Sequence, residues 1–269
     1  MTSPAPSPSS ASGHARLAGR TAIVTGSTSG IGAAIARTLA AEGATLVVSG
    51  RDGHRGQALV DTIAAGAAGG GGAAVFVPAD LAGSYADLRA FAAEATAALG
   101  GQVDILVNNA GIYPATLTEQ LPDADLDAML AVNIRAPHVL VAELAPAMAE
   151  RGSGVIVNIG SWMASVGSPY AAMYTATKAA DEQLTRSWAA EYGPRGVRVN
   201  TVAPGATLTP GNEAARAMLD AMTAGTPAGV VVQPDDVAQG VLYLVSDAAR
   251  MVHGITLYVD GGISATRPR

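Results

Sequence analysis

The segment Thr21-Ala-Ile-Val-Thr-Gly26-Ser-Thr-Ser-Gly30-Ile-Gly32 lies near the start of the chain. Its first five residues are apolar or β-branched and predict a buried strand, whereas residues 31–42 predict a helix. The glycines between them permit a tight turn through which the backbone can approach a pyrophosphate at the helix N-terminus. The spacing differs from the Gly-x-Gly-x-x-Gly fingerprint. A strand, a glycine-rich turn and a helix in this order nevertheless predict nucleotide binding rather than a turn without a ligand.

Short apolar runs alternate with helical stretches along the rest of the chain, which is typical of βαβ units. We therefore expect an α/β doubly wound Rossmann fold, with one seven-stranded parallel sheet covered by helices on both faces. Pro137 and Pro146 fall within one long predicted helix and could kink or split it, at a position that the sequence leaves open. Strands are predicted at 21–25, 45–49, 74–77, 103–108, 155–159, 197–202 and 256–259, and helices at 31–42, 55–65, 85–99, 123–150, 171–192, 212–222 and 235–246.

The domain is predicted to be single and to span residues 19–265. It follows a disordered Pro/Ser-rich tail at 1–18 and precedes a short C-terminal tail at 266–269. The tail has neither the basic start nor the apolar core of a signal peptide. The chain shows no apolar run of about 18 residues. We expect a cytoplasmic protein with no membrane partner.

Composition excludes several function classes. The 269 residues carry a formal net charge of −6 without a basic patch, so a nucleic acid is not an expected partner. The absence of cysteine excludes a thiol nucleophile, a disulfide framework and a cysteine-based zinc site. The four histidines are scattered and predict no metal site.

Tyr174 and Lys178 lie four residues apart in a predicted helix, so their side chains share one face. An ammonium group stabilises a nearby phenolate and should lower the tyrosine pKa from its ordinary value of about 10. The phenol then becomes a usable general acid or base. Ser161 follows a predicted strand upstream. Together with the nucleotide loop, these residues predict hydride transfer between a nicotinamide and a carbonyl or alcohol.

Several motifs occur in the order and spacing of one family. Over about residues 20–265 the chain resembles the short-chain dehydrogenase/reductase family, and in general character its 3-oxoacyl thioester (acyl-carrier-protein) reductases. The motifs are Thr25-Gly26-x-x-x-Gly30-Ile31-Gly32, Asn108-Asn109-Ala110-Gly111, Ser161, Tyr174-x-x-x-Lys178 and Pro204-Gly205.

The resemblance implies catalytic roles. Tyr174 would be the acid in reduction and the base in oxidation, and Ser161 would hydrogen-bond the substrate oxygen. Lys178 would lower the tyrosine pKa and hold the nicotinamide ribose. Asn133 would kink its helix and support a water relay to the lysine. The resemblance also assigns cofactor contacts to Gly26, Ser29, Gly30, Ile31, Gly32, Arg51, Asp80, Leu81, Asn108, Ala110, Gly111, Tyr174, Lys178, Pro204, Gly205 and Thr209.

The end of the second strand bears on cofactor choice. An acidic residue there would bind a ribose 2′-hydroxyl, and an arginine would pair with a 2′-phosphate. Alignment with the family places Gly50 at the acidic position and Arg51 after it, which favours NADP over NAD. Asp52 could compete for Arg51. In addition, Thr28-Ser29 stands where many NADP-preferring relatives carry a basic residue.

Apolar residues dominate the segments expected around the substrate, which suggests a ketone or secondary alcohol with an apolar body. The candidates are Tyr113, Trp162, Met163 and Tyr170, and a loop at about 205–232 is a candidate lid. The resemblance also implies a homotetramer, or a homodimer. Two other functions stay open: a redox-neutral dehydration or epimerisation, and a non-catalytic NADP-binding role.

Overall fold

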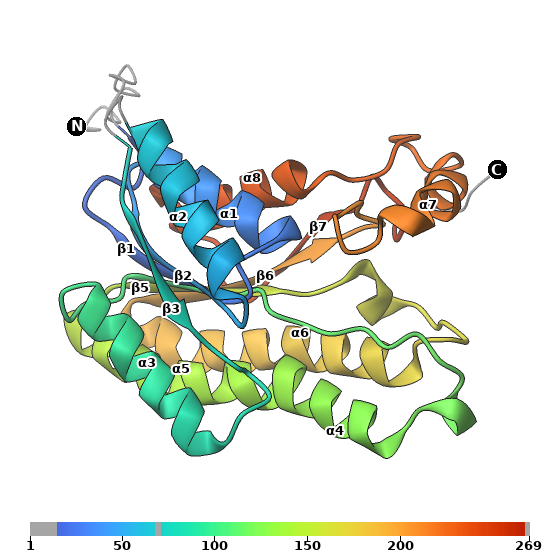
Figure 1. Cartoon of the computed structure of the whole chain (residues 1–269), viewed down its shortest axis with the longest axis horizontal. Coiled ribbons are helices and arrows are strands. Elements are labelled where there is room, and N and C mark those ends of the chain that lie inside the picture. The colour runs from blue at the N-terminus through green and yellow to red at the C-terminus, as the bar shows by residue number, and fades with distance from the viewer. Residues whose placement is uncertain (1–14, 68–70, 267–269) are drawn as a thin grey trace, which may run out of the picture.

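A computed structural model describes residues 15–67 and 71–266 of the chain (Figure 1). Seven parallel strands form one sheet in the order β3-β2-β1-β4-β5-β6-β7. Successive strands are added on one side of β1 up to β3 and on its other side from β4 onward, so the strand order reverses between β1 and β4. Ligands of such sheets bind at this reversal, beyond the carboxyl ends of the strands. The predicted α/β doubly wound Rossmann fold is confirmed. The strands are β1 Thr21–Val24, β2 Thr45–Gly50, β3 Ala74–Pro78, β4 Ile105–Asn108, β5 Gly154–Ile159, β6 Val197–Pro204 and β7 Thr256–Val259.

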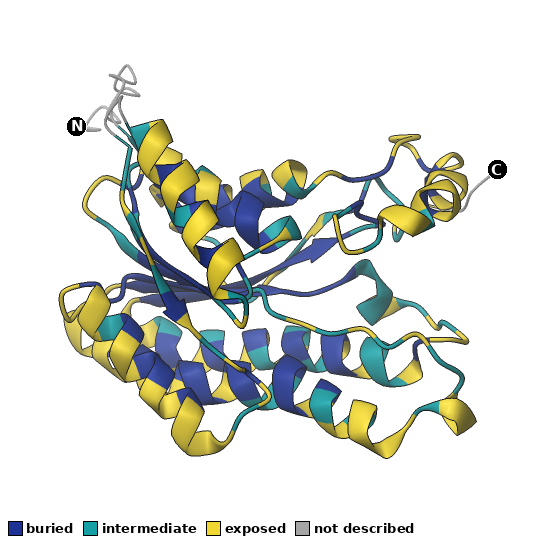
Figure 2. Ribbon diagram, viewed as in Figure 1, coloured by how far each residue is buried: buried dark blue, intermediate teal, exposed yellow. Residues whose placement is uncertain are grey.

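Helices cover both faces of the sheet, as Figure 1 shows. Alternate residues of β1 explain why both faces are apolar: Ala22 and Val24 belong to the core beneath α1 and α8, whereas Ile23 belongs to the core beneath α5. The helices turn their buried residues toward the sheet and their exposed residues outward (Figure 2). Their bounds are α1 Gly30–Ala41, α2 Gly53–Gly66, α3 Tyr85–Ala98, α4 Asp123–Leu130, α5 Ala136–Arg151, α6 Ala172–Tyr192, α7 Arg216–Thr223 and α8 Pro234–Val245.

The long helix predicted at 123–150 is interrupted. A π-helical turn, Ala131–Arg135, separates α4 from α5. Pro137 therefore stands in the first turn of α5, directly after the π-helical turn in which the regular i→i−4 hydrogen bonding is already interrupted. Pro146 lies inside α5 without ending it. The break that the sequence left open thus falls just before Pro137.

The segment Asp123–Arg151 is, by length and composition, apolar enough to cross a membrane. In this fold, however, 61% of its most apolar window is buried inside the protein. A core helix passes the same test, and the packing of α5 against the sheet accounts for the apolar residues of this one.

Several predicted boundaries differ from the structure; for example, α7 begins at Arg216 rather than at residue 212. The ordered domain includes residues 15–18, because Leu17 is only 2% exposed and its N–H donates to the Glu42 carbonyl at 2.8 Å. Strand β4 begins at Ile105 rather than at residue 103, since the Asp104 side chain accepts hydrogen bonds from Thr21. The parts of the predicted tails at residues 1–14 and 267–269, and residues 68–70 of the predicted domain, lie outside the described residues.

Candidate active site

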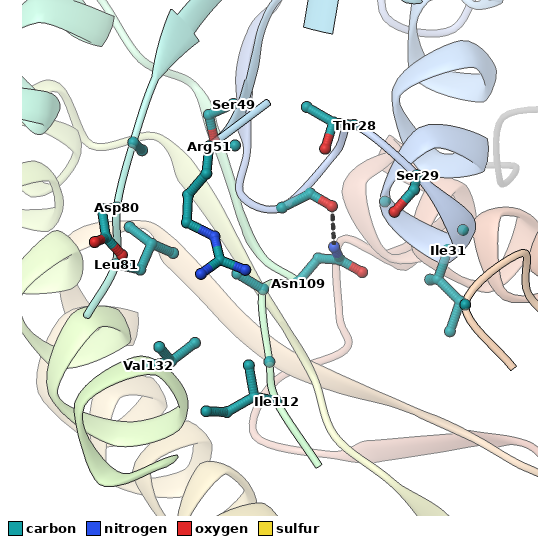
Figure 3. Close-up of a pocket in the computed structure, with 18 of the residues that line it drawn as sticks. Thr28, Ser29, Ile31, Ser49, Arg51, Asp80, Leu81, Asn109, Ile112 and Val132 are labelled. Atoms are coloured by element: carbon teal, nitrogen blue, oxygen red, sulfur yellow. Dashed lines mark hydrogen bonds between the residues drawn. The ribbon is translucent and has the colours of Figure 1, made fainter. Parts of the chain in front are cut away.

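A cavity of about 420 Å³ opens at the carboxyl ends of β1, β2, β3 and β4, at the reversal of strand order. The residues that line it come from the glycine-rich turn, from the loops that follow the other strands, and from α4 and the π-helical turn after it (Figure 3). Its position agrees with the prediction of a nucleotide site. The lining is Gly26, Thr28, Ser29, Gly30, Ile31, Gly32, Ser49, Gly50, Arg51, Ala79, Asp80, Leu81, Ala82, Asn109, Ala110, Gly111, Ile112, Ala128, Val132, Thr209 and Gly211.

The glycine-rich turn needs its glycines. Gly26 adopts a left-handed conformation with φ +61°. A Cβ on Gly32 would lie 2.4 Å from Asn109 Nδ2 and 2.5 Å from the Gly26 carbonyl oxygen, so no side chain fits there. Ser29 is the N-cap of α1, and its side chain makes no capping hydrogen bond within the described chain. The first N–H groups of α1 therefore face the cavity, where a helix N-terminus attracts an anion.

The adjacent residues Asn108 and Asn109 have different structural roles. Asn109 lines the cavity, and its Nδ2 donates to the carbonyl oxygens of Thr25 at 2.8 Å and Gly26 at 3.1 Å, which fixes the turn. Asn108, predicted to contact the cofactor, does not line the cavity. It is buried, and its Nδ2 donates to Asn158 Oδ1 at 2.9 Å across the sheet. Asn108 thus supports the centre of the sheet, and its neighbour Asn109 forms part of the cavity wall.

Arg51 extends from the end of β2 into the cavity, near Asp80 and Leu81 (Figure 3). Asp52 does not compete for it in the way that the sequence suggested. Its carboxylate caps α2 by accepting from the Arg55 N–H at 3.1 Å, and it pairs with Arg55 Nε at 3.0 Å. The Arg51 guanidinium therefore remains directed toward the cavity.

The predicted lid at about 205–232 contains a small core of its own. Ala206, Leu208, Leu219 and Val231 are buried together, and a bridge joins Thr207 to Val232. Thr209 lines the cavity opposite Gly30, at the start of α1, and its contact with the cofactor stays a prediction.

Pro204 and Gly205 do not line the cavity. Gly205 is held against Asp260, whose Cα would lie 2.6 Å from an added Cβ. This pair therefore fixes the exit of β6 next to the C-terminal turn.

Helix α6 carries the predicted Tyr174 and Lys178. The Lys178 side chain is buried, and its Nζ donates to the Ile159 carbonyl at 2.8 Å and to Asp181 Oδ2 at 2.9 Å. A Cβ on Gly111 would lie 3.6 Å from this nitrogen. Because Gly111 lines the cavity, the ammonium lies directly behind the cavity wall.

Lys178 and Asp181 influence each other's protonation. Burial alone lowers the pKa of Lys178, but the Asp181 carboxylate and Tyr174 together more than offset this effect, and the pKa lies above its ordinary value. Burial raises the pKa of Asp181, and the ammonium offsets only part of that rise. The two side chains therefore form an ion pair in a site from which water is largely excluded.

The predicted substrate residues lie around the start of α6. The Tyr113 and Tyr174 rings are in contact, with centroids 4.4 Å apart. Burial, followed by the proximity of Tyr174, raises the pKa of Tyr113. The Thr116 N–H donates to the Tyr170 carbonyl at 2.9 Å, which joins the two loops that carry Tyr113 and Tyr170.

Ser161 is the N-cap of the turn Trp162–Ser165, and its buried hydroxyl accepts from the Met163 N–H at 3.1 Å. Trp162 and Met163 are half-buried in this turn.

Asn133 lies within the π-helical turn, which confirms that its helix is distorted there. Its Oδ1 accepts from the Ile112 N–H at 2.9 Å, and its Nδ2 donates to the Ile112 carbonyl and to Thr177 Oγ1, each at 3.1 Å. The side chain therefore connects the cavity loop to α6. The water relay to Lys178 stays a prediction.

Sequence reasoning missed Asp181, Asn109 and Thr28 as residues of this region. Asp181 could have been found from its i+3 spacing to Lys178, since side chains three residues apart on a helix are neighbours. Asn109 stands in a recognised motif in which only Asn108, Ala110 and Gly111 were assigned cofactor contacts. Thr28 lies beside Gly50, an approach between two loops that spacing does not show.

Comparisons with known proteins agree with this geometry. A family model described as enoyl-(acyl carrier protein) reductase matches residues 26–264. A D-threitol dehydrogenase of Mycolicibacterium smegmatis is 39% identical over 249 residues, which cover 92% of this chain and 94% of that protein. An L-rhamnose 1-dehydrogenase (NAD(P)(+)) of Azotobacter vinelandii is 37% identical over 251 residues, which cover 92% and 97%.

Among solved structures, a short-chain dehydrogenase from Burkholderia cenocepacia in complex with NADP superposes with a TM-score of 0.84 at 38% identity, covering 93% of this chain and 100% of that one. The similarity extends through the glycine-rich turn, the cavity and α6. This chain therefore belongs to the short-chain dehydrogenase/reductase family and is an oxidoreductase that acts on CH–OH groups.

Proposed function

We propose that this chain is an NADP(H)-dependent oxidoreductase that interconverts a ketone and a secondary alcohol. One observation carries the proposal: α6 holds Tyr174 and Lys178 on one face, and the Lys178 ammonium lies behind Gly111 in the wall of the nucleotide cavity. A proton donor and a positive charge thus lie beside the site that would hold a nicotinamide cofactor.

The residues of the cavity fit such a cofactor. Gly26 and Gly32 leave the close approach that a pyrophosphate needs, and the N-terminus of α1 supplies N–H groups and a positive dipole end. Asp80 and Leu81 would flank the adenine. The bound cofactor would supply the hydride in ketone reduction and accept it in alcohol oxidation.

The side chains of the chain would handle the proton and the oxygen. Tyr174 would give its phenolic proton to the carbonyl oxygen during reduction and take it back during oxidation. The Ser161 hydroxyl would donate a hydrogen bond to the same oxygen, where negative charge develops. The Lys178 ammonium would stabilise the Tyr174 phenolate and bind the ribose, and Asn133 would hold the loop at Ile112 in place.

Arg51 supports the choice of NADP. Its guanidinium projects into the cavity from the end of β2, next to Gly50, and Asp52 is occupied by Arg55. A guanidinium binds a phosphate through parallel charged hydrogen bonds. We therefore assign the 2′-phosphate of NADP to Arg51.

The substrate that we propose has an apolar body beside the reacting carbon. Tyr113, Trp162, Met163 and Tyr170 surround the start of α6 with mainly apolar surface, and Tyr113 contacts the Tyr174 ring directly. The two relatives named above act on D-threitol and L-rhamnose. Polyols and sugars therefore belong beside cyclic and aromatic ketones among the candidates.

Self-association is part of the proposal, with a homotetramer or homodimer as the expected state. Large apolar side chains are exposed on and beside β7, the edge strand of the sheet: Tyr243, Met251, Ile255 and Tyr258. A second copy would cover such a surface.

A spectrophotometric assay tests the proposed activity. The absorbance of NADPH, and separately of NADH, is followed with 3-oxoacyl thioesters, cyclic and aromatic ketones and 2-hydroxyketones. Alcohol oxidation is assayed with threitol, rhamnose and cyclic secondary alcohols. We expect turnover of one class with NADPH. Tight NADPH binding without turnover of any compound would contradict the proposal and favour a redox-neutral or non-catalytic role.

A further inference from the structure

Helix α6 carries a second charged side chain, Asp181, on the face of Tyr174 and Lys178. Asp181 follows Lys178 by three residues, and its Oδ2 lies 2.9 Å from Lys178 Nζ. The Lys178 and Asp181 side chains are only 6% and 5% exposed, so both charges are buried. The ammonium is thus held between Asp181 and the Ile159 carbonyl at the end of β5.

This pairing needs an explanation other than stability. A buried ion pair contributes little to folding, because the loss of hydration offsets most of the attraction between the two charges. Among the described residues, Lys178 is the hydrogen-bond partner of the Asp181 carboxylate. The carboxylate therefore acts mainly on the lysine beside the reacting tyrosine.

We propose that Asp181 is a positioning residue of the active site. It holds the Lys178 ammonium toward β5, and its negative charge sets the pH at which the Tyr174–Lys178 couple loses its first proton. The proposal rests on the function proposed above for Tyr174 and Lys178.

The sign of the effect follows from electrostatics. A negative charge holds protons on both neighbouring groups, whichever of the two loses its proton first. Tyr174 and Asp181 are seven residues apart, or about 10 Å along the helix axis. At an effective dielectric constant of about 20, a unit charge at this distance changes a pKa by about one unit. By pairing with the Lys178 ammonium, Asp181 therefore extends the alkaline range in which the Tyr174–Lys178 couple keeps the proton that ketone reduction needs.

Other titratable groups face this cluster from neighbouring elements. Tyr113, on the loop after β4, contacts Tyr174. Glu182, next to Asp181, faces Thr256 and Tyr258 of β7 and interacts with Arg186. These groups are the same in the protein and in a variant at position 181. Glu182 also interacts with the Asp181 charge, so its contribution needs a control variant of its own.

The first test is the pH dependence of ketone reduction at saturating NADPH. In Asp181→Asn, the alkaline limb of kcat/KM should move to lower pH by about one unit, whereas Asp181→Glu should restore it. The matched control is Glu182→Gln, which removes a half-buried carboxylate that does not contact Lys178 and should give a smaller shift. Asp181→Ser replaces Asp181→Asn if that variant does not fold.

The second test needs no turnover. Phenolate absorbance of the NADP-bound protein is titrated against pH, and the same titration of Tyr174→Phe is subtracted to isolate Tyr174. The phenolate should form at lower pH in Asp181→Asn. If both the alkaline limb of kcat/KM and the phenolate titration are unchanged in Asp181→Asn, the proposal is overturned. Asp181 would then have only a structural role, even if the variant has a lower Tm. If no ketone is reduced, the proposed function fails, whereas this titration still decides the role of Asp181.

Discussion

The two ends of the parallel sheet differ in how their polar groups are satisfied. At the amino end, Asp104 accepts from the Thr21 N–H at 2.9 Å and from Gln102 Nε2 at 2.7 Å. Arg198, at the start of β6, donates to the Leu244 carbonyl at 2.6 Å and to the Ser246 carbonyl at 3.1 Å. Neighbouring segments of the chain thus bind these charged groups directly.

At the carboxyl end, charged and polar groups face a cavity instead. The start of α1 and Arg51 point into it, and Lys178 lies just behind its wall. The buried aspartates show the same contrast. Burial would raise the pKa of Asp104, but hydrogen bonds from Thr21 and Gln102 more than offset it, and the pKa is lowered. The pKa of Asp181 is raised. The amino end therefore supports folding, and the carboxyl end is arranged for chemistry.

The largest expected effect lies at the carboxyl end. Tyr174→Phe should keep cofactor binding and thermal stability but lose at least about 10²-fold in kcat, because the general acid is gone. Steady-state kinetics and NADPH titration by fluorescence measure the two effects separately. Tyr113→Phe, which keeps the contacting ring, is the matched control. Turnover of Tyr174→Phe near that of the unmodified protein would refute the mechanism.

Removing the positive charge from the cavity tests the cofactor assignment. Arg51→Ala should raise the KM for NADPH by about 10- to 100-fold and leave the KM for NADH nearly unchanged, since only NADPH carries the 2′-phosphate. Arg89→Ala, which removes an exposed arginine paired with Glu143, is the control. Equal effects of Arg51→Ala on both cofactors would contradict the assignment.

A switch of preference toward NAD requires a third change. Gly50→Asp with Arg51→Ala should favour NAD, but a Cβ on Gly50 would lie 2.8 Å from Thr28 Cγ2 and 2.9 Å from Thr28 Oγ1. Thr28→Ala removes both atoms and leaves Thr28 Cβ at 3.5 Å. The triple variant should therefore bind NADH more tightly than the double variant does. An unchanged ratio of kcat/KM for the two cofactors would argue against Gly50 and Arg51 as determinants.

The smallest effect is expected at the amino end. Asp104→Asn should lower the free energy of unfolding by about 1–3 kcal/mol without changing kcat, since it replaces a carboxylate that accepts from Thr21 and Gln102. Asp61→Asn, on the exposed face of α2, should be nearly neutral. If Asp104→Asn loses more activity than its loss of folded protein explains, the amino end of the sheet does more than support folding, and the contrast between the two ends is wrong.

The difference in stability between the protein and Asp104→Asn should depend on pH, with a definite sign. The folded-state pKa of Asp104 is lowered, so its contribution to stability is complete above the unfolded pKa of about 3.9 and is lost as the pH falls through the folded value. Urea unfolding between about pH 6 and pH 3 should therefore show the stabilities of the protein and of Asp104→Asn converging in acid. A constant difference would assign the effect to packing.

Local pattern was enough to predict the sheet, its helices and the position of the cavity. It failed where distant segments meet. Leu17 looked like part of a tail because its apolar contacts are with α1, which is distant in the sequence. The roles of Asn108 and Asn109 could not be distinguished because the path of the chain after β4 decides which of them faces the glycine-rich turn.

The sequence by itself determined the alternation of strands and helices, the glycine-rich turn and the shared face of Tyr174 and Lys178, because these depend on backbone sterics and on the helical repeat. The tertiary structure decided that Asp181 is buried against Lys178, that Tyr113 lies on Tyr174, and that Thr28 limits what Gly50 can become. Burial and contact depend on which segments the fold brings together, and the charge of a side chain acts differently once water has been excluded from it.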